Sequence, residues 1–170
     1  LDQRRVDIVR CVLCSAVFIH RDFPEELLER FYMRETGGGI PNNMENFGWW
    51  LQNTKGAILD VLRHIEKEKP GPLLDVGCGR GTLLYLARQQ GWEVTGLDIN
   101  TDMVQFVRNG LGIPALSGNI YNTALPTEHF GVITLFDVLE HIYAPVRMLE
   151  RCRELLRPGG VVVVKSPHGK

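Results

Sequence analysis

The sequence lacks the features that mark several large functional classes. Its formal net charge is −1, and it has no basic stretch of the kind that binds nucleic acid. Its longest uncharged apolar run, around Val132 to Phe136, is far shorter than the roughly 20 residues needed to span a bilayer. We therefore expect neither a nucleic-acid partner nor a membrane.

Cysteine is also scarce. The 170 residues include four cysteines, too few and too unevenly spread for a disulfide framework: Cys11, Cys14, Cys78 and Cys152. No secretory signal precedes the first motif, so we expect a reducing, cytoplasmic location. The chain opens without Met and stops just after an apolar run, and we interpret both ends as continuing into a longer protein.

The residues that are present divide into three segments. Residues 1–21 hold a cysteine pair and a short apolar stretch. Residues 22–69 have helical periodicity, with a break expected at the three glycines 37–39 and core packing expected for Trp49 and Trp50. From residue 70 onward, strands alternate with helices.

The third segment predicts a doubly wound α/β fold of the Rossmann-like kind. Its short runs of Val, Ile and Leu lack polar alternation, which is typical of parallel strands covered on both faces. Helical segments join these strands, so we expect a mostly parallel sheet with helices on both faces. The expected strands are 73–76, 93–97, 113–116, 132–136 and 161–165, and the expected helices are 82–90, 101–109 and 144–156.

A glycine-rich turn follows the first expected strand, in LLDVGCGRGTLL at 73–84. Gly77, Gly79 and Gly81 allow the backbone to turn sharply and to approach a ligand closely. The next helix directs its N-terminal amides toward that ligand. A P-loop is excluded because no Lys-Ser/Thr pair closes the turn. The dinucleotide fingerprint matches poorly, because Thr82 stands where its third glycine belongs.

Two acids accompany the turn. Asp75 lies two residues before the first glycine, where a carboxylate would repel a diphosphate but suits a cationic group. Asp98 ends the second expected strand in WEVTGLDIN, where it can accept bonds from both hydroxyls of a ribose. Together they describe an adenosine that carries an amino acid and a positive charge, which is S-adenosylmethionine.

Residues 72–168 resemble a class I S-adenosylmethionine-dependent methyltransferase, of the broad group that includes ubiquinone-biosynthesis O-methyltransferases. The matching segments are LLDVGCGRGTLL, VTGLDIN, FGVITLFDVLEHI and LLRPGGVVVVKSPH. The resemblance implies that the glycine loop, with Cys78 inside it, holds the methionine part of the cofactor and that Asp98 holds the ribose. The family's sheet normally continues past the fifth strand with two more strands, and these are missing here.

The resemblance also implies further contacts to S-adenosylmethionine. Ile99 and Met103 would flank the adenosine. Asn119 and Ile120 would lie at the adenine edge, where the family usually has an Asp in place of Asn119. The backbone near Phe136 would meet the methionine amino group.

Three interpretations of His141 stay open. It can line and shape the pocket wall, or it can act as general base for a hydroxyl acceptor, since His accepts a proton near neutral pH. It can also bind a divalent cation with Asp137 and Glu140, if one helical turn brings the three together. Relatives of the ubiquinone type use acids and a His in this region for metal, although Asp137 stands in place of their usual Glu. His168 is a second candidate at the same rim.

Cys11 and Cys14 form a Cys-x-x-Cys pair in VRCVLCSAVF. The pair resembles the second knuckle of a zinc ribbon found before some methyltransferases of this group. A structural zinc takes four ligands, so a matching first pair is expected before residue 1, and His20 as third ligand would leave the fourth missing. The alternative is a reduced pair with no role.

The predicted organisation is a partial zinc-ribbon-like segment at 1–21, a helical or lid segment at 22–69 and a methyltransferase core at 70–170. The predicted function is transfer of a methyl group from S-adenosylmethionine to a small-molecule or carrier-bound acceptor. Methyl transfer mainly needs alignment of the reactants and exclusion of water, so it marks the acceptor little in the sequence. The alternatives are a non-catalytic S-adenosylmethionine-binding protein and an NAD-dependent oxidoreductase, which would need a pyrophosphate cradle.

Overall fold

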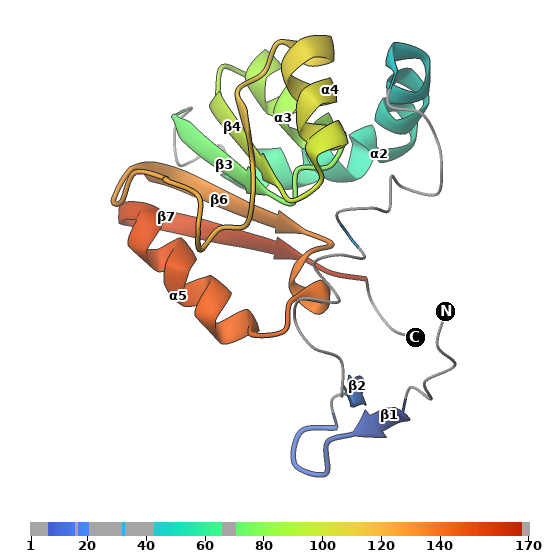
Figure 1. The fold of residues 1–170 in the computed structure, drawn as a ribbon, viewed down its shortest axis with the longest axis vertical. Helices are drawn as coiled ribbons and strands as arrows, with labels where there is room; N and C mark the ends of the chain where they lie inside the picture. Colours follow the sequence, from blue (N-terminus) through green and yellow to red (C-terminus); the bar gives the residue numbers. More distant parts are fainter. Residues whose placement is uncertain (1–6, 16, 21–31, 33–42, 66–70, 168–170) are drawn as a thin grey trace.

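The computed structural model describes residues 7–15, 17–20, 32, 43–65 and 71–167 (Figure 1). The first part of the expected helical segment, residues 22–31, the glycines at 37–39 and the rim candidate His168 lie outside these residues. No helix in the described ranges is long and apolar enough to cross a membrane.

Five parallel strands form the central sheet. Its strands are β3 (Pro72–Val76), β4 (Glu93–Asp98), β5 (Ala115–Ser117), β6 (Phe130–Phe136) and β7 (Leu156–Lys165), in the spatial order β5-β4-β3-β6-β7. Each neighbouring pair is parallel. The chain reverses its direction of travel across the sheet between β3 and β6, which makes the carboxyl ends of these strands the place where a ligand binds in such folds. The Rossmann-like prediction is confirmed.

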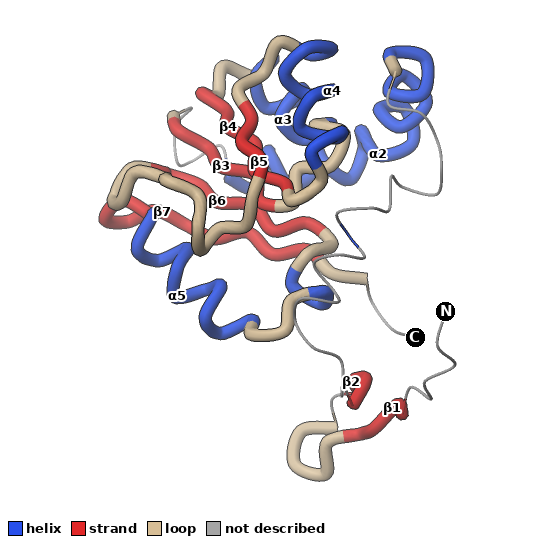
Figure 2. Tube along the Cα trace, in the orientation of Figure 1, coloured by secondary structure: helices blue, strands red, loops and turns tan. Residues whose placement is uncertain are grey.

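Helices cover both faces of the sheet. Residues of α2 (Met44–Ile65), α3 (Thr82–Gln89) and α4 (Thr101–Leu111) share one buried cluster with Leu73, whereas residues of α5 (Pro145–Leu155) share another with Leu74. Consecutive residues of β3 therefore contribute to opposite faces, as alternation along a strand requires. Figure 2 shows α5 on the side of the sheet opposite α3 and α4.

The two ends of α4 are set by the residues that cap it. Asn100 begins α4, since its Oδ1 accepts the main-chain N–H groups of Asp102 and Met103 at 3.0 and 3.2 Å. This cap satisfies two of the amides that a helix start leaves without partners. Gly112 then ends α4 in a left-handed conformation with φ 61°. These two ends fix where the loops after β4 and before β5 lie.

The start of the last strand differs from the expectation. We expected Pro158-Gly159-Gly160 to separate helix 144–156 from strand 161–165, but α5 ends at Leu155 and β7 runs from Leu156. Phe130 pairs with Leu156 and Val132 pairs with Val161, so the Pro-Gly-Gly residues form an irregularity within the strand. A positive φ of 79° at Gly159 permits that bulge.

The tryptophans of α2 also depart from the core packing expected for them. Trp49 is 56% exposed, and its ring meets that of Trp50 edge-on at 5.1 Å. Trp50 is partly buried, and the guanidinium of Arg80 lies 4.9 Å from its ring centre. The buried face of α2 consists of Phe47, Ile58, Leu62 and Ile65.

Candidate functional site

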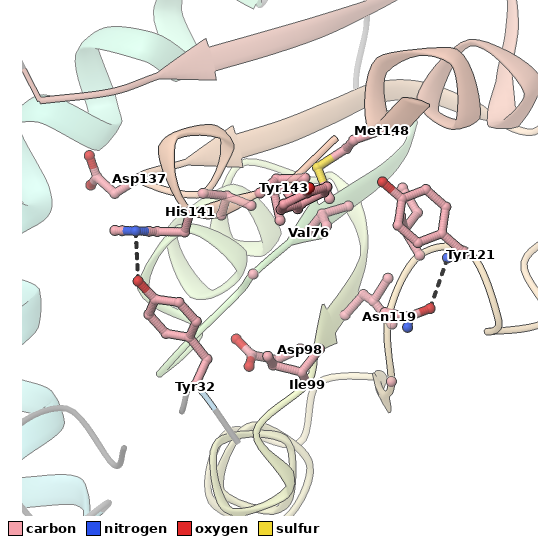
Figure 3. Close-up of a pocket in the computed structure, with 16 residues that line it drawn as sticks. Tyr32, Val76, Asp98, Ile99, Asn119, Tyr121, Asp137, His141, Tyr143 and Met148 are labelled. Atoms are coloured by element: carbon pink, nitrogen blue, oxygen red, sulfur yellow. Dashed lines mark hydrogen bonds between the residues drawn. The ribbon is translucent and has the colours of Figure 1, made fainter. Parts of the chain in front are cut away.

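A cavity of about 300 Å³ opens at the carboxyl ends of β3, β4, β5 and β6 (Figure 3). This is the switch point at which the sheet topology predicts a ligand. The lining residues are Tyr32, Val76, Gly77, Leu97, Asp98, Ile99, Gly118, Asn119, Ile120, Tyr121, Asp137, Val138, His141, Ile142, Tyr143 and Met148. None of these lining residues is Lys or Arg.

Gly77 is one of the residues that line the cavity. It has φ 71°, and a Cβ built there would overlap Cγ2 of Val138. Its main-chain N–H and that of Cys78 both donate to the carbonyl of Leu97, at 2.7 and 3.1 Å. These bonds hold the turn after β3 against the end of β4. A side chain at position 77 would push the turn and Val138 apart.

The other two glycines of the loop have different surroundings. Gly79 has φ 49°, no atom within 4 Å of a Cβ built on it, and an N–H that donates to Asp98 Oδ2 at 2.8 Å. At Gly81, which precedes α3 with φ 74°, a Cβ would lie 2.9 Å from Val107 and 3.2 Å from Leu111. Gly81 therefore allows α3 to pack closely against α4, while Gly79 keeps open the space beside the loop.

Asp98 is the acid that reaches the cavity. Its two carboxylate oxygens accept the N–H groups of Gly79 and Asn100, each at 2.8 Å. Burial raises the pKa of Asp98 above its ordinary value, and the backbone N–H donors oppose that rise. The hydrogen bonds to this carboxylate do not fully compensate for its loss of solvent. Further donors, such as the two hydroxyls of a diol, would stabilise its charged form.

Asp75 lies beneath the cavity and is not part of its wall. It is 3% exposed, and its Oδ1 accepts the hydroxyl of Thr134 at 2.6 Å. Burial raises the pKa of Asp75 to about 7, and the negative charge of Asp98 adds to this rise. The carboxylate lies within the sheet, because Asp75 belongs to β3 and its side chain points toward β6. Its expected suitability for a cationic group stays a prediction.

The residues expected at the adenine edge lie along the wall of the cavity. Ile99, Asn119 and Ile120 line it together with Tyr121. The Oδ1 of Asn119 accepts the N–H groups of Tyr121 and Asn122 at 3.1 and 2.9 Å, which shapes the turn after β5. The amide oxygen of Asn119 is thus engaged by the backbone, and its expected place at the adenine edge stays a prediction.

Three further residues that we expected at the cofactor do not line the cavity. Cys78 is 7% exposed, and a Cβ at Gly96 would lie 2.8 Å from its sulfur. Met103 is buried inside α4, and Phe136 is partly buried against the core. The expectation at Phe136 concerned its backbone, and the contacts of all three residues with the cofactor stay predictions.

His141 lies at the opposite side of the cavity from Asn119 and Tyr121 (Figure 3). It ends a short 3₁₀ helix, Leu139–His141, after β6. Its Nδ1 lies 2.7 Å from the hydroxyl of Tyr32, and the two rings are 5.0 Å apart at 48°. Tyr32 comes from a segment 109 residues earlier in the chain.

The expected cluster of Asp137, Glu140 and His141 does not assemble. Asp137 has φ 55°, outside the helical range, and its carboxylate bonds Lys165 at 2.7 Å. Glu140 accepts the hydroxyl of Ser166 at 3.1 Å. Both acids are thereby held by β7 and the residue after it. In the described ranges no three His, Cys, Asp or Glu side chains gather in a way that could hold a metal ion.

The cysteine pair lies in a separate hairpin. Strands β1 (Asp7–Arg10) and β2 (Val17–His20) are antiparallel, and the Ser15 N–H donates to the Cys11 carbonyl at 2.9 Å across their turn. Backbone hydrogen bonds from Cys14 and Leu13 lower the pKa of the Cys11 thiol. Cys11 and Cys14 are both free thiols, so the described part of this hairpin supplies two possible zinc ligands.

Sequence reasoning missed several residues of the cavity wall. Tyr121 directly follows Ile120, and Tyr143 directly follows the segment FGVITLFDVLEHI, so both positions could have been included from adjacency alone. Met148 comes from the buried face of α5. Tyr32 has no local signal, because only the tertiary structure brings it to His141.

Comparisons with known proteins agree with this architecture. A family model for a methyltransferase domain matches residues 50–169. The ubiquinone biosynthesis O-methyltransferase of Actinobacillus pleuropneumoniae serotype 5b is 34% identical over 133 residues, which cover 67% of this chain and 57% of that protein. The corresponding protein of Coxiella burnetii (strain Dugway 5J108-111) is 33% identical over 125 residues, covering 66% and 53%. The chain thus spans somewhat more than half the length of these relatives.

Solved structures give the same result for the fold. An S-adenosylmethionine-dependent methyltransferase from Mesorhizobium loti aligns with a TM-score of 0.57 at 26% identity, covering 64% of this chain and 52% of that one. Phosphoethanolamine N-methyltransferase 2 of Haemonchus contortus, solved with S-adenosyl-L-methionine, aligns with a TM-score of 0.60 at 22% identity, covering 64% and 27%. With the family model matching well over half of its residues, the chain belongs to the methyltransferase domain family, among the class I S-adenosylmethionine-dependent methyltransferases.

Proposed function

We propose that the protein binds S-adenosylmethionine in the cavity and transfers its methyl group to a small-molecule or carrier-bound acceptor. The observation that carries the proposal is the position of Asp98, a partly buried carboxylate at the end of β4 that faces a cavity without Lys or Arg in its wall. Such a wall favours an uncharged ribose and a cationic group and disfavours a diphosphate. Bound S-adenosylmethionine supplies an electrophilic methyl group on a positively charged sulfur.

The residues of the cavity fit the parts of this cofactor in order. Asp98 would accept the two ribose hydroxyls, since each of its oxygens already has one backbone donor and keeps capacity for another. Ile99 and Ile120 would enclose the adenine between apolar surfaces. The open space beside Gly79 would admit the methionine part next to the loop. Asp75 would contribute a negative field from below without direct contact.

The acceptor side of the cavity is the end that contains His141. Relatives named ubiquinone biosynthesis O-methyltransferase support a hydroxyl-bearing small molecule as acceptor. We propose that His141 lies at this acceptor and that no nucleic acid or membrane takes part. All four thiols are free in the structure, which is compatible with the proposed cytoplasmic location.

Ligand calorimetry tests the proposed cofactor. S-adenosylhomocysteine should bind the full chain, and NAD should bind far more weakly, because NAD needs a cradle for two phosphates. Clear binding of NAD with no heat from S-adenosylhomocysteine or S-adenosylmethionine would sink the proposal. Methyl transfer from labelled S-adenosylmethionine to a panel of acceptors then separates an enzyme from a binding protein without turnover.

We also propose that Cys11 and Cys14 supply half of a structural zinc site in the full-length protein. Their place at one hairpin turn and the backbone N–H groups directed at the Cys11 sulfur suit thiolate ligands. The chain's two thiolates would hold one side of a tetrahedral ion. Metal analysis of the full-length protein should find one zinc per chain, and its complete absence would remove this proposal.

A further inference from the structure

Asp75 is a buried carboxyl group beneath the cavity. It is 3% exposed, and Thr134 on β6 donates its hydroxyl to Oδ1 of Asp75 at 2.6 Å. Its neighbour in register on β4 is Gly96, which has no side chain to offer as a donor. In the described ranges no Lys or Arg forms an ion pair with Asp75. The ionised form of Asp75 is therefore poorly stabilised, and burial raises its pKa to about 7.

The titratable side chains that interact with Asp75 bring it no positive charge. Asp98 at the end of β4 is an acid, and its negative charge adds to the rise in the pKa of Asp75. Burial raises the pKa of the Cys78 thiol in the glycine loop, so this neighbour is neutral. The other charged groups of the surrounding elements are exposed or bonded elsewhere: Arg80 over Trp50, Lys165 with Asp137, Arg88 with two carbonyls at the end of α4, and the exposed acids and bases of α2 and α4.

Asp75 responds to charge in the cavity. The two residues that follow it, Val76 and Gly77, line the cavity, and so does Asp98 (Figure 3). The negative charge of Asp98 at this wall makes ionisation of Asp75 less favourable. A positive charge held in the same cavity acts with the opposite sign, so it favours the ionised form of Asp75.

We propose that Asp75 makes the cavity discriminate the charged methyl donor from its uncharged-sulfur product, by releasing a proton when the donor binds and taking one back after transfer. This inference rests on the proposed function. On transfer, the acceptor forms a bond to the methyl carbon, and the electron pair of the broken carbon–sulfur bond stays on sulfur, which loses its positive charge. Asp75 then takes a proton from water, because the charge that favoured its ionised form has gone.

The ratio of two affinities isolates this effect. S-adenosylmethionine and S-adenosylhomocysteine share the adenosine and the amino acid and differ by one methyl group and one positive charge. Contacts to the ribose, including those proposed for Asp98, therefore contribute equally to both affinities and cancel in their ratio. At low pH Asp75 is neutral in both complexes. As the pH rises, Asp75 ionises first in the complex with the charged donor, so the preference for S-adenosylmethionine increases.

The experiment is calorimetry of the full chain with both ligands. Between about pH 5 and about pH 8, the preference for S-adenosylmethionine over S-adenosylhomocysteine should rise about 3- to 30-fold. Titrations in phosphate and in Tris, which differ in ionisation enthalpy, count the protons released on binding. At the pH of the largest difference, S-adenosylmethionine should release about 0.3–0.7 proton more per site than S-adenosylhomocysteine.

Three variants assign the effect. Asp75→Asn cannot ionise, so the ratio of affinities should be constant across this range. Thr134→Val removes the hydroxyl that opposes the rise in the pKa of Asp75, so the increase in preference should move to higher pH. His141→Gln removes the histidine of the cavity wall, since imidazoles ionise in the same pH range, and it should keep the increase.

The outcomes separate this proposal from the proposed function. Failure of both ligands to bind the wild type overturns the proposed function and this inference with it. Binding of both ligands with a constant ratio and equal proton release overturns the role of Asp75 and leaves the proposed function standing. An increase that persists in folded Asp75→Asn, or that disappears in His141→Gln, also overturns the role of Asp75. If Asp75→Asn does not fold, the proton release of the wild type and the shift in Thr134→Val decide.

Discussion

The N–H of Gly79 donates to Oδ2 of Asp98 across 2.8 Å, which ties the glycine loop after β3 to the end of β4. The other carboxylate oxygen accepts the N–H of Asn100 at the same distance. Asp98 therefore both shapes the cavity and presents a charge to it. A ligand that donates hydroxyl groups to this carboxylate would compensate for its burial, so we expect the affinity for such a ligand to depend on the ionisation of Asp98.

Asp98→Asn should weaken binding of S-adenosylhomocysteine about 10- to 100-fold, the scale of charge-assisted hydrogen bonds. Because the pKa of Asp98 is raised, wild-type affinity should be full above that pKa and fall as the pH is lowered through it. The variant should lose this pH dependence. Calorimetry across pH measures both effects. Asp102→Asn, which neutralises an exposed acid of α4, is the matched control, and equal affinity of Asp98→Asn and wild type would refute the ribose assignment.

Gly77→Ala should lower the free energy of unfolding by about 2–4 kcal/mol. Alanine is strained at the positive φ of this position, and its Cβ would also overlap the side chain of Val138. Gly79→Ala has a positive φ as well but open space around its Cβ, so it should cost only about 1 kcal/mol. Urea unfolding of both variants checks this order. Val138→Ala should recover part of the loss in the Gly77→Ala background, and a double variant no more stable than Gly77→Ala would argue against the overlap.

Asp75 should make stability depend on pH. Its folded-state pKa of about 7 lies above the ordinary value, so the contribution of the neutral carboxyl is present below about pH 4 and is lost as pH rises through 7. Asp75→Asn keeps an acceptor for Thr134 but cannot ionise. Relative to wild type, it should gain about 2–4 kcal/mol of stability between pH 5 and pH 7.5. Urea midpoints at both values measure this gain, and a constant difference would show that Asp75 does not titrate in this range.

The four thiols should fall into two classes. Backbone N–H donors lower the pKa of Cys11, and Cys14 is exposed, so both should react rapidly with a disulfide reagent in metal-free protein. Burial raises the pKa of Cys152 to about 11 and that of Cys78 further, so both should react only on unfolding. Reaction kinetics with and without denaturant count the classes. More than two rapidly reacting thiols in the folded state would contradict this burial.

The sequence by itself determined the order of the sheet elements and two of the groups that meet at the cavity. Uninterrupted Val, Ile and Leu runs predict buried parallel strands, and the five observed strands overlap those expected. Gly77 and Asp98 follow strands, and the carboxyl ends of parallel strands share one edge of a sheet. Their meeting was therefore predictable without coordinates.

Only the tertiary structure decided the rest. Asp75 and Asp98 are both acids near strand ends, but one is buried against Thr134 and the other lines the cavity, a difference set by side-chain direction. Tyr32 reaches His141 across 109 residues, and no local periodicity encodes such a contact. Local sequence fixes which backbone conformations are favourable, whereas the packing of distant segments decides which side chains share a site.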